Sequence, residues 1–236
     1  MNTAEKLTFF PDIGPEATPL EIFQVGCECA RGRVAIACSF GIDNVVLLYH
    51  PKDNPDKVTI FAIDTGRLNE ETYEVADNIT QRYGVTINWY FPQHDKVEAL
   101  EREKGLFSFR ESFANRKECC FIRKVEPLQR ALQGLSAWTT GMRREQCDTR
   151  ANQKPVEIDA GNGGLLKINP LTFWSEKAIW EYAREHRLPI NRLHQQGYPS
   201  IGCAPCTRAI QDGEDHRAGR WWWEGAAHKE CGLHCR

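Results

Sequence analysis

The hydrophobic positions of the chain form short apolar runs that alternate with amphipathic segments. Apolar runs rich in Val, Ile and Phe lie at residues 33–38, 58–63 and 85–91 and are typical of buried strands. Helical spacing of apolar residues lies around them, at residues 20–31, 44–50 and 69–83. This alternation predicts a Rossmann-like α/β domain, in which helices cover both faces of a parallel sheet.

The second half of the chain continues this pattern and then loses it. We expect a helix at residues 119–132, strands at 137–140 and 165–168, and a helix at 175–187 with Ser175 as its N-cap. After residue 188, Gly, Pro, Cys, His and Trp become frequent and the periodicity fades. We therefore predict one α/β domain over residues 1–210, followed by a mobile tail at 211–236.

Composition narrows the choice of partners. The 236 residues include 30 Lys and Arg against 32 Asp and Glu, so the net charge of -2 does not favour nucleic acid or an anionic membrane as a partner. No apolar run is long enough to span a bilayer. The first residues lack the basic and apolar regions of a secretory signal, so we expect a cytoplasmic protein.

Cysteine is frequent, with 10 residues, several of them close together in the sequence. In a chain without a secretory signal, such clusters favour metal binding or redox catalysis over disulfides. Two of these clusters are the adjacent pair Cys119 and Cys120 and the spaced pair Cys203 and Cys206. Thiolates bind zinc or iron–sulfur clusters. Neighbouring side chains diverge, which suits the separate irons of a cluster better than one zinc ion. For these four cysteines we favour an iron–sulfur cluster, with zinc, disulfides or free thiols as alternatives. Free cysteines are often buried, and we interpret four others in this way: Cys27, Cys29, Cys38 and Cys147.

Two strand ends indicate a nucleotide site. The first predicted strand runs into Ser39-Phe40-Gly41 and then a helix, which presents backbone N–H groups and a helix dipole to an anion. The second ends at Asp64-Thr65-Gly66. Ligands of open parallel sheets bind at the carboxyl ends of the strands, so both turns are expected to share one site. The alternative is a tight turn that needs Gly41 only for its backbone angles.

The last residues contain a candidate nucleophile. Cys231 lies among His228, Lys229 and His234, whose positive charge would favour the thiolate. The alternative is a frayed terminus with surface thiols.

Arginine is frequent further upstream, and its planar guanidinium matches the oxygens of phosphate and sulfate. Among the basic residues, we expect Arg116, Lys117 and Arg130 to be solvated charges on helix faces. We expect the three consecutive tryptophans at 221–223 to pack in the core or in a lid.

Together these motifs resemble a known family. The segments that carry the resemblance are Cys119-Cys120-x-x-Arg123-Lys124-Val-Glu-Pro-Leu, Thr140-Gly-x-Arg-Arg144, Thr149-Arg150, Gly202-Cys-x-Pro-Cys-Thr-Arg208, Gly219-Arg-Trp-Trp-Trp-Glu224 and Lys229-Glu-Cys-Gly-Leu-His234. They are similar to the cluster-containing assimilatory adenylyl-sulfate (APS) reductases, within the adenine-nucleotide α-hydrolase-like superfamily. The resemblance runs from about residue 33 to residue 234.

The resemblance implies both a cofactor and a reaction. It implies a [4Fe-4S] cluster on Cys119, Cys120, Cys203 and Cys206. It implies that Cys231 is the nucleophile, with Lys124 and His234 as further catalytic residues, and that thioredoxin or glutaredoxin is the reductant. It implies contacts to substrate from Ser39, Gly41, Asp43, Thr65, Gly141, Arg150, Arg217 and Arg220.

Several alternatives stay open beside this resemblance. The turn at residues 38–43 departs from the family pattern and is similar to that of cluster-free relatives that use the 3′-phosphorylated nucleotide (PAPS). The alternatives are the same chemistry on PAPS, an ATP-using thiolation enzyme of the superfamily, and a metal- or cluster-binding module without catalysis. The sequence also leaves open whether the chain forms a homo-oligomer.

Overall fold

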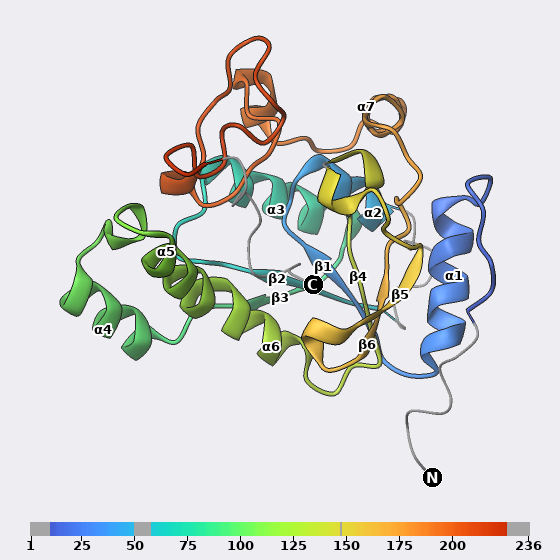
Figure 1. The fold of residues 1–236 in the computed structure, drawn as a ribbon. Helices are drawn as coiled ribbons and strands as arrows, with labels where there is room; N and C mark the ends of the chain where they lie inside the picture. Colours follow the sequence, from blue (N-terminus) through green and yellow to red (C-terminus); the bar gives the residue numbers. More distant parts are fainter. Residues whose placement is uncertain (1–9, 50–57, 147, 226–236) are drawn as a thin grey trace.

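The computed structural model describes residues 10–49, 58–146 and 148–225, and in this part of the chain one mixed sheet forms the centre of the fold (Figure 1). Its strand order is β3-β2-β1-β4-β6-β5. All neighbours pair in parallel except β5 and β6, which are antiparallel. The strands are β1 (Val34–Cys38), β2 (Val58–Ile63), β3 (Ile87–Tyr90), β4 (Ala137–Thr139), β5 (Val156–Asp159) and β6 (Leu165–Ile168).

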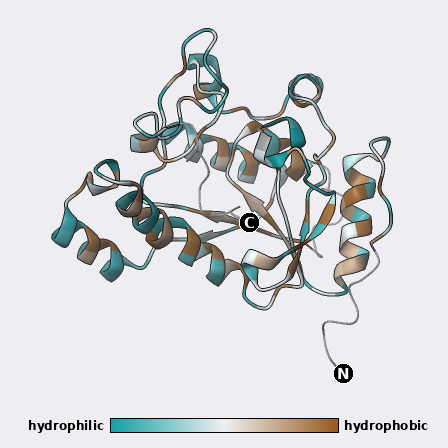
Figure 2. Cartoon of the chain, viewed as in Figure 1, coloured by the Kyte–Doolittle hydropathy of each residue, from teal (hydrophilic) through white to brown (hydrophobic). Residues whose placement is uncertain are grey.

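Helices cover both faces of this sheet, as the sequence predicted. Ile36 of β1 packs in the core cluster of α2, α3 and α7, whereas its neighbour Ala35 packs with Leu128 of α6 on the opposite face. Figure 2 shows the resulting pattern, with hydrophobic strands at the centre and hydrophilic outer helix faces. The helices are α1 (Pro19–Ala30), α2 (Ile42–Tyr49), α3 (Glu70–Tyr83), α4 (His94–Lys104), α5 (Phe113–Cys120), α6 (Glu126–Leu132) and α7 (Glu176–Glu185).

Local sequence signals explain several boundaries. Thr18 and Glu21 form a capping box at the start of α1, and the Ser175 side chain caps α7 by accepting from the backbone N–H of Ala178. Asn69 occupies the N-cap position of α3 but makes no capping hydrogen bond. Its side chain instead donates to the carbonyl of Gly202, which ties α3 to the C-terminal region.

The structure refines the sequence interpretation and adds two elements to it. The expected helix at 119–132 is confirmed, but helical structure already begins at Phe113, and a π-helical turn at Phe121–Val125 lies between α5 and α6. Helix α2 begins at Ile42, so Asp43 lies in its first turn and not in the loop before it. Helix α4 and the antiparallel strand β5 were not predicted. Charged residues dominate α4, and β5 is an edge strand of only four residues, too short for its apolar–polar alternation to stand out.

Residues 188–225 are mostly irregular and pack near the carboxyl ends of the strands, where Figure 1 shows them in orange and red near α3. The backbone N–H of Ala204 donates to the carbonyl of Arg67 over 2.8 Å, just after the end of β2. An isolated bridge pairs Thr207 with Arg220. No described helix is long and apolar enough to cross a membrane.

Candidate active site

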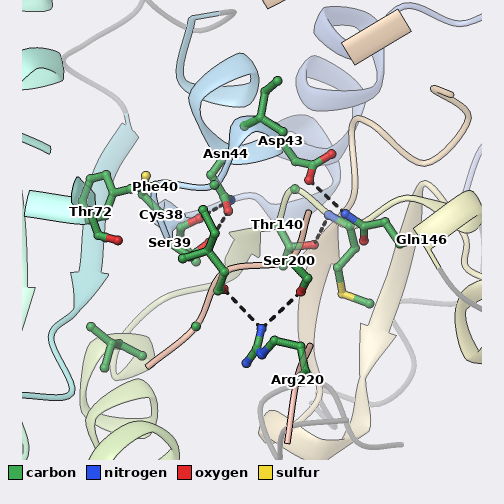
Figure 3. A pocket seen from close by; sticks show the side chains of 18 of the residues that line it. Cys38, Ser39, Phe40, Asp43, Asn44, Thr72, Thr140, Gln146, Ser200 and Arg220 are labelled. Carbon is green, nitrogen blue, oxygen red and sulfur yellow. Dashed lines mark hydrogen bonds between the residues drawn. The ribbon is translucent and has the colours of Figure 1, made fainter. Parts of the chain in front are cut away.

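The turn after β1 forms one wall of a pocket at the carboxyl edge of the sheet (Figure 3). The Ser39 hydroxyl donates to Asn44 Oδ1 over 2.6 Å, and Asn44 Nδ2 donates to the carbonyl of Ala37 over 3.0 Å. Phe40 has a positive φ of 60° and is nevertheless buried, stacked on Trp89 at a centroid distance of 5.3 Å. A non-glycine residue in this backbone region is strained, and packing of the ring offsets that strain. The turn is therefore fixed before any ligand arrives.

An ion pair fixes the first turn of α2. Asp43 accepts from Arg143 Nε over 2.6 Å and from Gln146 Nε2 over 3.1 Å. Gln146 Oε1 in turn accepts from the Arg150 guanidinium. Asp43 is thus committed to protein partners and holds the loop after β4 against α2.

Gly141 allows that loop to approach α2 closely. A Cβ at this position would lie 3.0 Å from Asn44 Nδ2 and 3.2 Å from the backbone N of Asn44. Such contacts are tighter than ordinary van der Waals packing, so a side chain would push the loop after β4 away from the turn after β1. Glycine is required here by space, not by its φ angle.

The pocket between these walls has a volume of about 240 Å³. Phe61, Ile63, Leu68 and Leu128 give it an apolar side. Lys124, Arg217 and Arg220 also line it and supply positive charge. An apolar cavity with a few polar groups and a basic region suits a ligand with a flat base and an anionic group. Every described residue that the family resemblance assigned to substrate lines this pocket: Ser39, Gly41, Asp43, Thr65, Gly141, Arg150, Arg217 and Arg220.

A second, smaller cavity adjoins the first and contains all four predicted ligand cysteines. It is lined by Cys119 and Cys120 from α5 and by Cys203 and Cys206 from the C-terminal region. Lys124 lines both cavities. In the described part of the chain, no three His, Cys, Asp or Glu side chains converge closely enough to hold a single metal ion. The cysteines surround a shared space, which is the arrangement that a cluster with separate irons needs.

Buried cations surround the cysteine cavity. Arg123 donates to the carbonyl of Thr65 over 2.8 Å and to Glu101 over 2.5 Å. Arg67 shares the same carboxylate oxygen of Glu101 at 2.6 Å. One acidic residue therefore orients two arginines beside the cysteines, and both remain largely buried.

Three of the four cysteines, Cys119, Cys203 and Cys206, do not share one electrostatic environment. Burial raises the pKa of Cys206 to about 12, and the neighbouring Cys203 adds to the rise. Burial also raises the pKa of Cys119, although the charges of Arg67 and Arg123 oppose this. At Cys203 burial is outweighed by the charge of Lys124 and by a hydrogen bond with Thr65, so the pKa of Cys203 is lowered. Of Cys119, Cys203 and Cys206, Cys203 is the one whose environment favours the thiolate.

Several buried N–H donors near the cysteines suit an electron-rich group between them. Among the described residues, no hydrogen-bond acceptor is found for Arg123 Nε, Trp221 Nε1 or Trp223 Nε1. Both tryptophans belong to, or pack against, the apolar cluster that contains Cys119, Cys203 and Cys206. Buried donors are normally satisfied, and sulfide or thiolate sulfur in a cluster would accept from them. The donor set and the cysteines thus fit an iron–sulfur cluster.

The expectation that Arg116 is a solvated surface charge is wrong. Its side chain is 1% exposed and forms a bidentate ion pair with Glu224, with Nε–Oε1 at 2.6 Å and Nη2–Oε2 at 2.9 Å. The tryptophans at 221–223 were expected to pack in the core or in a lid. This holds for Trp221, which is buried, whereas Trp222 is exposed.

A family model agrees with this geometry. The model for the phosphoadenosine phosphosulfate reductase domain matches residues 33–209. The chain belongs to this family. The matched residues include both strand-end turns and all four cavity cysteines, and they end before the tail at 211–236.

Similar members of the phosphoadenosine phosphosulfate reductase family extend over nearly the whole chain. An adenosine 5′-phosphosulfate reductase of Allochromatium vinosum is 48% identical over 94% of this chain and 86% of its own length. One of Burkholderia cepacia is 44% identical over 99% of this chain and 93% of its own length. A probable chloroplastic 5′-adenylylsulfate reductase of Oryza sativa is 46% identical over 92% of this chain, which spans 47% of that longer relative.

Solved structures agree on the fold of the family. The phosphoadenylyl-sulfate reductase of Candida auris, in a phosphate complex, has a TM-score of 0.69 and 26% identity over 83% of this chain and 91% of its own. The FMN adenylyltransferase of Candida glabrata has a TM-score of 0.51 at 17% identity, over 92% of this chain and 69% of its own, which indicates a shared fold only.

Some pocket residues were not found by sequence reasoning. Gln146 joins Asp43 to Arg150, and the Ser200 hydroxyl lies 3.3 Å from Arg220 Nη1. His194 and His216 also line the pocket. Nothing in the local sequence singles these residues out, because each reaches the pocket from a loop or a short 3-10 helix. The predicted catalytic residues Cys231 and His234 lie outside the described residues.

Proposed function

We propose that this chain reduces adenylyl sulfate to sulfite and AMP in assimilatory sulfate reduction, with Cys231 as the nucleophile. The observation that carries the proposal is the adjacency of the two cavities. A pocket suited to a nucleotide has Lys124 in its wall, and the same residue lines the cavity of the four cysteines. The bacterial relatives that match nearly the whole chain are adenosine 5′-phosphosulfate reductases.

The apolar side of the pocket would take the adenine, and its cationic residues would take the phosphosulfate. Lys124, Arg217 and Arg220 line the pocket and match the anionic part of the substrate. They would reduce the repulsion between an anionic nucleophile and an anionic substrate, and would stabilise charge on the departing phosphate. Electrostatic contributions of this kind are typically about 2.7–4 kcal/mol each.

Cys119, Cys120, Cys203 and Cys206 would hold a [4Fe-4S] cluster. When bound, the cluster supplies structural cross-linking between α5 and the C-terminal region and an electrostatic field beside the substrate. Lys124 would interact with both the cluster and the phosphosulfate, since it lines both cavities. The reaction that we propose for Cys231 needs no electrons from the cluster.

In the first step, the Cys231 thiolate attacks the sulfur of the bound substrate. A bond forms between the two sulfur atoms, the bond from the substrate sulfur to the bridging phosphate oxygen breaks, and AMP leaves. Cys231 then carries an S-sulfonate, a covalent intermediate that divides one difficult reaction into two easier ones. His234 would contribute positive charge beside this thiolate.

In the second step, a dithiol protein such as thioredoxin or glutaredoxin attacks the Cys231 sulfur. Sulfite leaves, and the second thiol of the reductant resolves the mixed disulfide and regenerates Cys231. The two electrons that reduce the substrate sulfur therefore come from the dithiol. Thioredoxin-type reductants work in a reducing compartment, which agrees with the cytoplasmic location that we propose for this chain.

A steady-state assay tests this function. Cluster-loaded protein with thioredoxin, thioredoxin reductase and NADPH should release sulfite from adenylyl sulfate, and Cys231→Ser should remove this activity. Faster turnover of the 3′-phosphorylated nucleotide would instead favour the second candidate, a reductase with the substrate named for the Candida auris structure. Absence of sulfite from both nucleotides would contradict the proposal.

A further inference from the structure

The ion pair between Arg116 and Glu224 connects the helix of the first two cysteines with the last described residues of the chain. Arg116 lies in α5, three residues before Cys119. Glu224 lies seven positions before Cys231 in the sequence. The side chains are 1% and 9% exposed, so this pair is far more buried than the ion pair of Lys104 with Glu118, a second pair that involves α5.

Arg116 also reaches the cysteine cavity. It lines that cavity together with Cys120. Burial opposes the charge of Arg116, but the hydrogen bond and charge of Glu224, followed by those of Cys120, outweigh it, and the pKa of Arg116 is raised. One guanidinium thus interacts with a candidate cluster ligand and with Glu224 at the same time.

Aromatic packing and backbone bonds hold the pair in a single orientation. The Arg116 guanidinium lies over the Trp221 ring at 4.5 Å and over the Phe113 ring at 4.8 Å. The backbone N–H of Glu224 donates to the carbonyl of Trp221 over 2.8 Å, and that of Trp221 donates to the carbonyl of Cys206 over 3.1 Å. Glu224 is therefore fixed relative to ligand cysteines from both chain segments.

A buried ion pair of this kind is weak evidence for stability, because desolvation of two charges offsets their attraction. Its best-attested role is to select one arrangement over others. A planar guanidinium and a carboxylate that meet through two parallel hydrogen bonds are well suited to this, since the geometry permits little rotation.

We propose that Arg116 and Glu224 are a positioning pair that sets the starting point of the segment carrying Cys231, so that the rate of S-sulfonation depends on them while nucleotide binding does not. This inference rests on the proposed function of Cys231. Only six residues separate Glu224 from Cys231, and the seven steps of chain between them span at most about 23–25 Å. The pair therefore fixes the point from which the segment that carries Cys231 must reach the substrate sulfur, and small misplacements of reacting groups have large effects on rate.

The test compares single-turnover S-sulfonation with nucleotide affinity in the same protein. Anaerobic, cluster-loaded protein is mixed with saturating adenylyl sulfate without reductant, and intact mass is followed over time. Glu224→Gln keeps the shape of the side chain and removes its charge. We expect its rate constant for S-sulfonation to fall about tenfold, with AMP affinity and the visible spectrum of the cluster unchanged. Glu118→Gln, which removes a more exposed ion pair of α5 with Lys104, should behave as wild type.

A second variant covers the case in which Glu224→Gln folds poorly. Glu224→Asp keeps a paired charge but shortens the side chain by one methylene, so it should also slow S-sulfonation without weakening AMP binding. An unchanged rate in a folded variant would overturn the inference. So would a slower rate accompanied by an equal loss of AMP affinity or of cluster, since that would assign the pair a structural role. No adduct in the wild type would contradict the proposed function itself, and this inference with it.

Discussion

The nucleotide pocket and the cysteine cavity share Lys124 but differ in what joins their walls. In the pocket, the polar groups of the walls bond to one another, as Asp43 does with Arg143 and Gln146. Around the cysteines, buried donors such as Arg123 Nε and Trp221 Nε1 have no acceptor among the described residues. Buried polar atoms without a hydrogen-bond partner among the described residues also line the pocket, namely Arg220 Nε, His194 Nε2 and His216 Nδ1. The walls of the pocket are nevertheless joined by side-chain contacts, whereas the four cysteines surround a space that fits a group that becomes part of the fold. The pocket should therefore tolerate loss of its ligand, and the cysteine cavity should not.

The largest expected effect is from Cys203→Ser. Serine binds cluster iron far less well than a thiolate does, so we expect loss of bound iron and of the brown colour, with a marked fall in thermal stability. Iron analysis and thermal unfolding without oxygen measure both. Cys29→Ser, at a half-buried thiol outside the cavity, should keep full iron content. Retention of cluster by Cys203→Ser would refute the assignment of this ligand.

The next effect concerns the cations beside the cysteines. Glu101→Gln should lower the free energy of unfolding by about 3 kcal/mol, because it leaves two buried arginines without their shared carboxylate. Urea unfolding measures it. The matched control is Glu98→Gln on the same helix, whose pair with Arg102 is exposed and should be worth less than about 1 kcal/mol. Equal losses in the two variants would contradict a special role for Glu101.

A smaller and more selective effect is expected at the nucleotide pocket. In Gly141→Ala the new Cβ would press on Asn44 and move the loop after β4. We expect AMP affinity to fall about tenfold, which corresponds to about 1.4 kcal/mol, while iron content stays at the wild-type level. Calorimetric titration with AMP measures this. Loss of iron along with affinity would show that the two sites are less independent than proposed.

The smallest effect is a matter of thiol reactivity. Burial, together with the charge of Glu28, raises the pKa of Cys27 to about 11, and burial raises that of Cys38 to about 12. Both thiols are therefore protonated at pH 8, and their thiolate fraction rises only as the pH approaches these values. Peptide mass analysis after brief iodoacetamide treatment at pH 8 should find Cys27 and Cys38 unmodified and Cys231 alkylated. The reverse order would contradict the assignment of Cys231 as the reactive thiol.

The parts of the fold that sequence reasoning predicted are those with strong hydrophobic periodicity. The run at 58–63 is strand β2 without any change of bounds, and Ser175 caps α7 as predicted. Helix α4 was missed because it buries little apart from Leu100, so its apolar spacing is weak. The π-helical turn at Phe121–Val125 inserts an irregularity that no hydrophobic period encodes.

The residues of the candidate site also differ in how far the sequence predicts them. Residues within motifs, such as Gly141 and Lys124, were found because their neighbours in the sequence mark them. Gln146 and the buried pair of Arg116 with Glu224 depend on contacts between segments about a hundred residues apart. A charge on a short helix looks solvated in the sequence, and only the fold shows that Trp221 and Glu224 cover Arg116.

The central claim is that the reaction passes through a covalent adduct on Cys231. Purified, cluster-loaded protein is incubated with adenylyl sulfate without oxygen or reductant, and the mass of the intact chain is measured. We predict a gain of one SO3 group per chain, its absence in Cys231→Ser, and its removal by reduced thioredoxin with release of sulfite. A folded, brown protein that gains no such mass, or a Cys231→Ser variant that still gains it, would contradict the proposed mechanism.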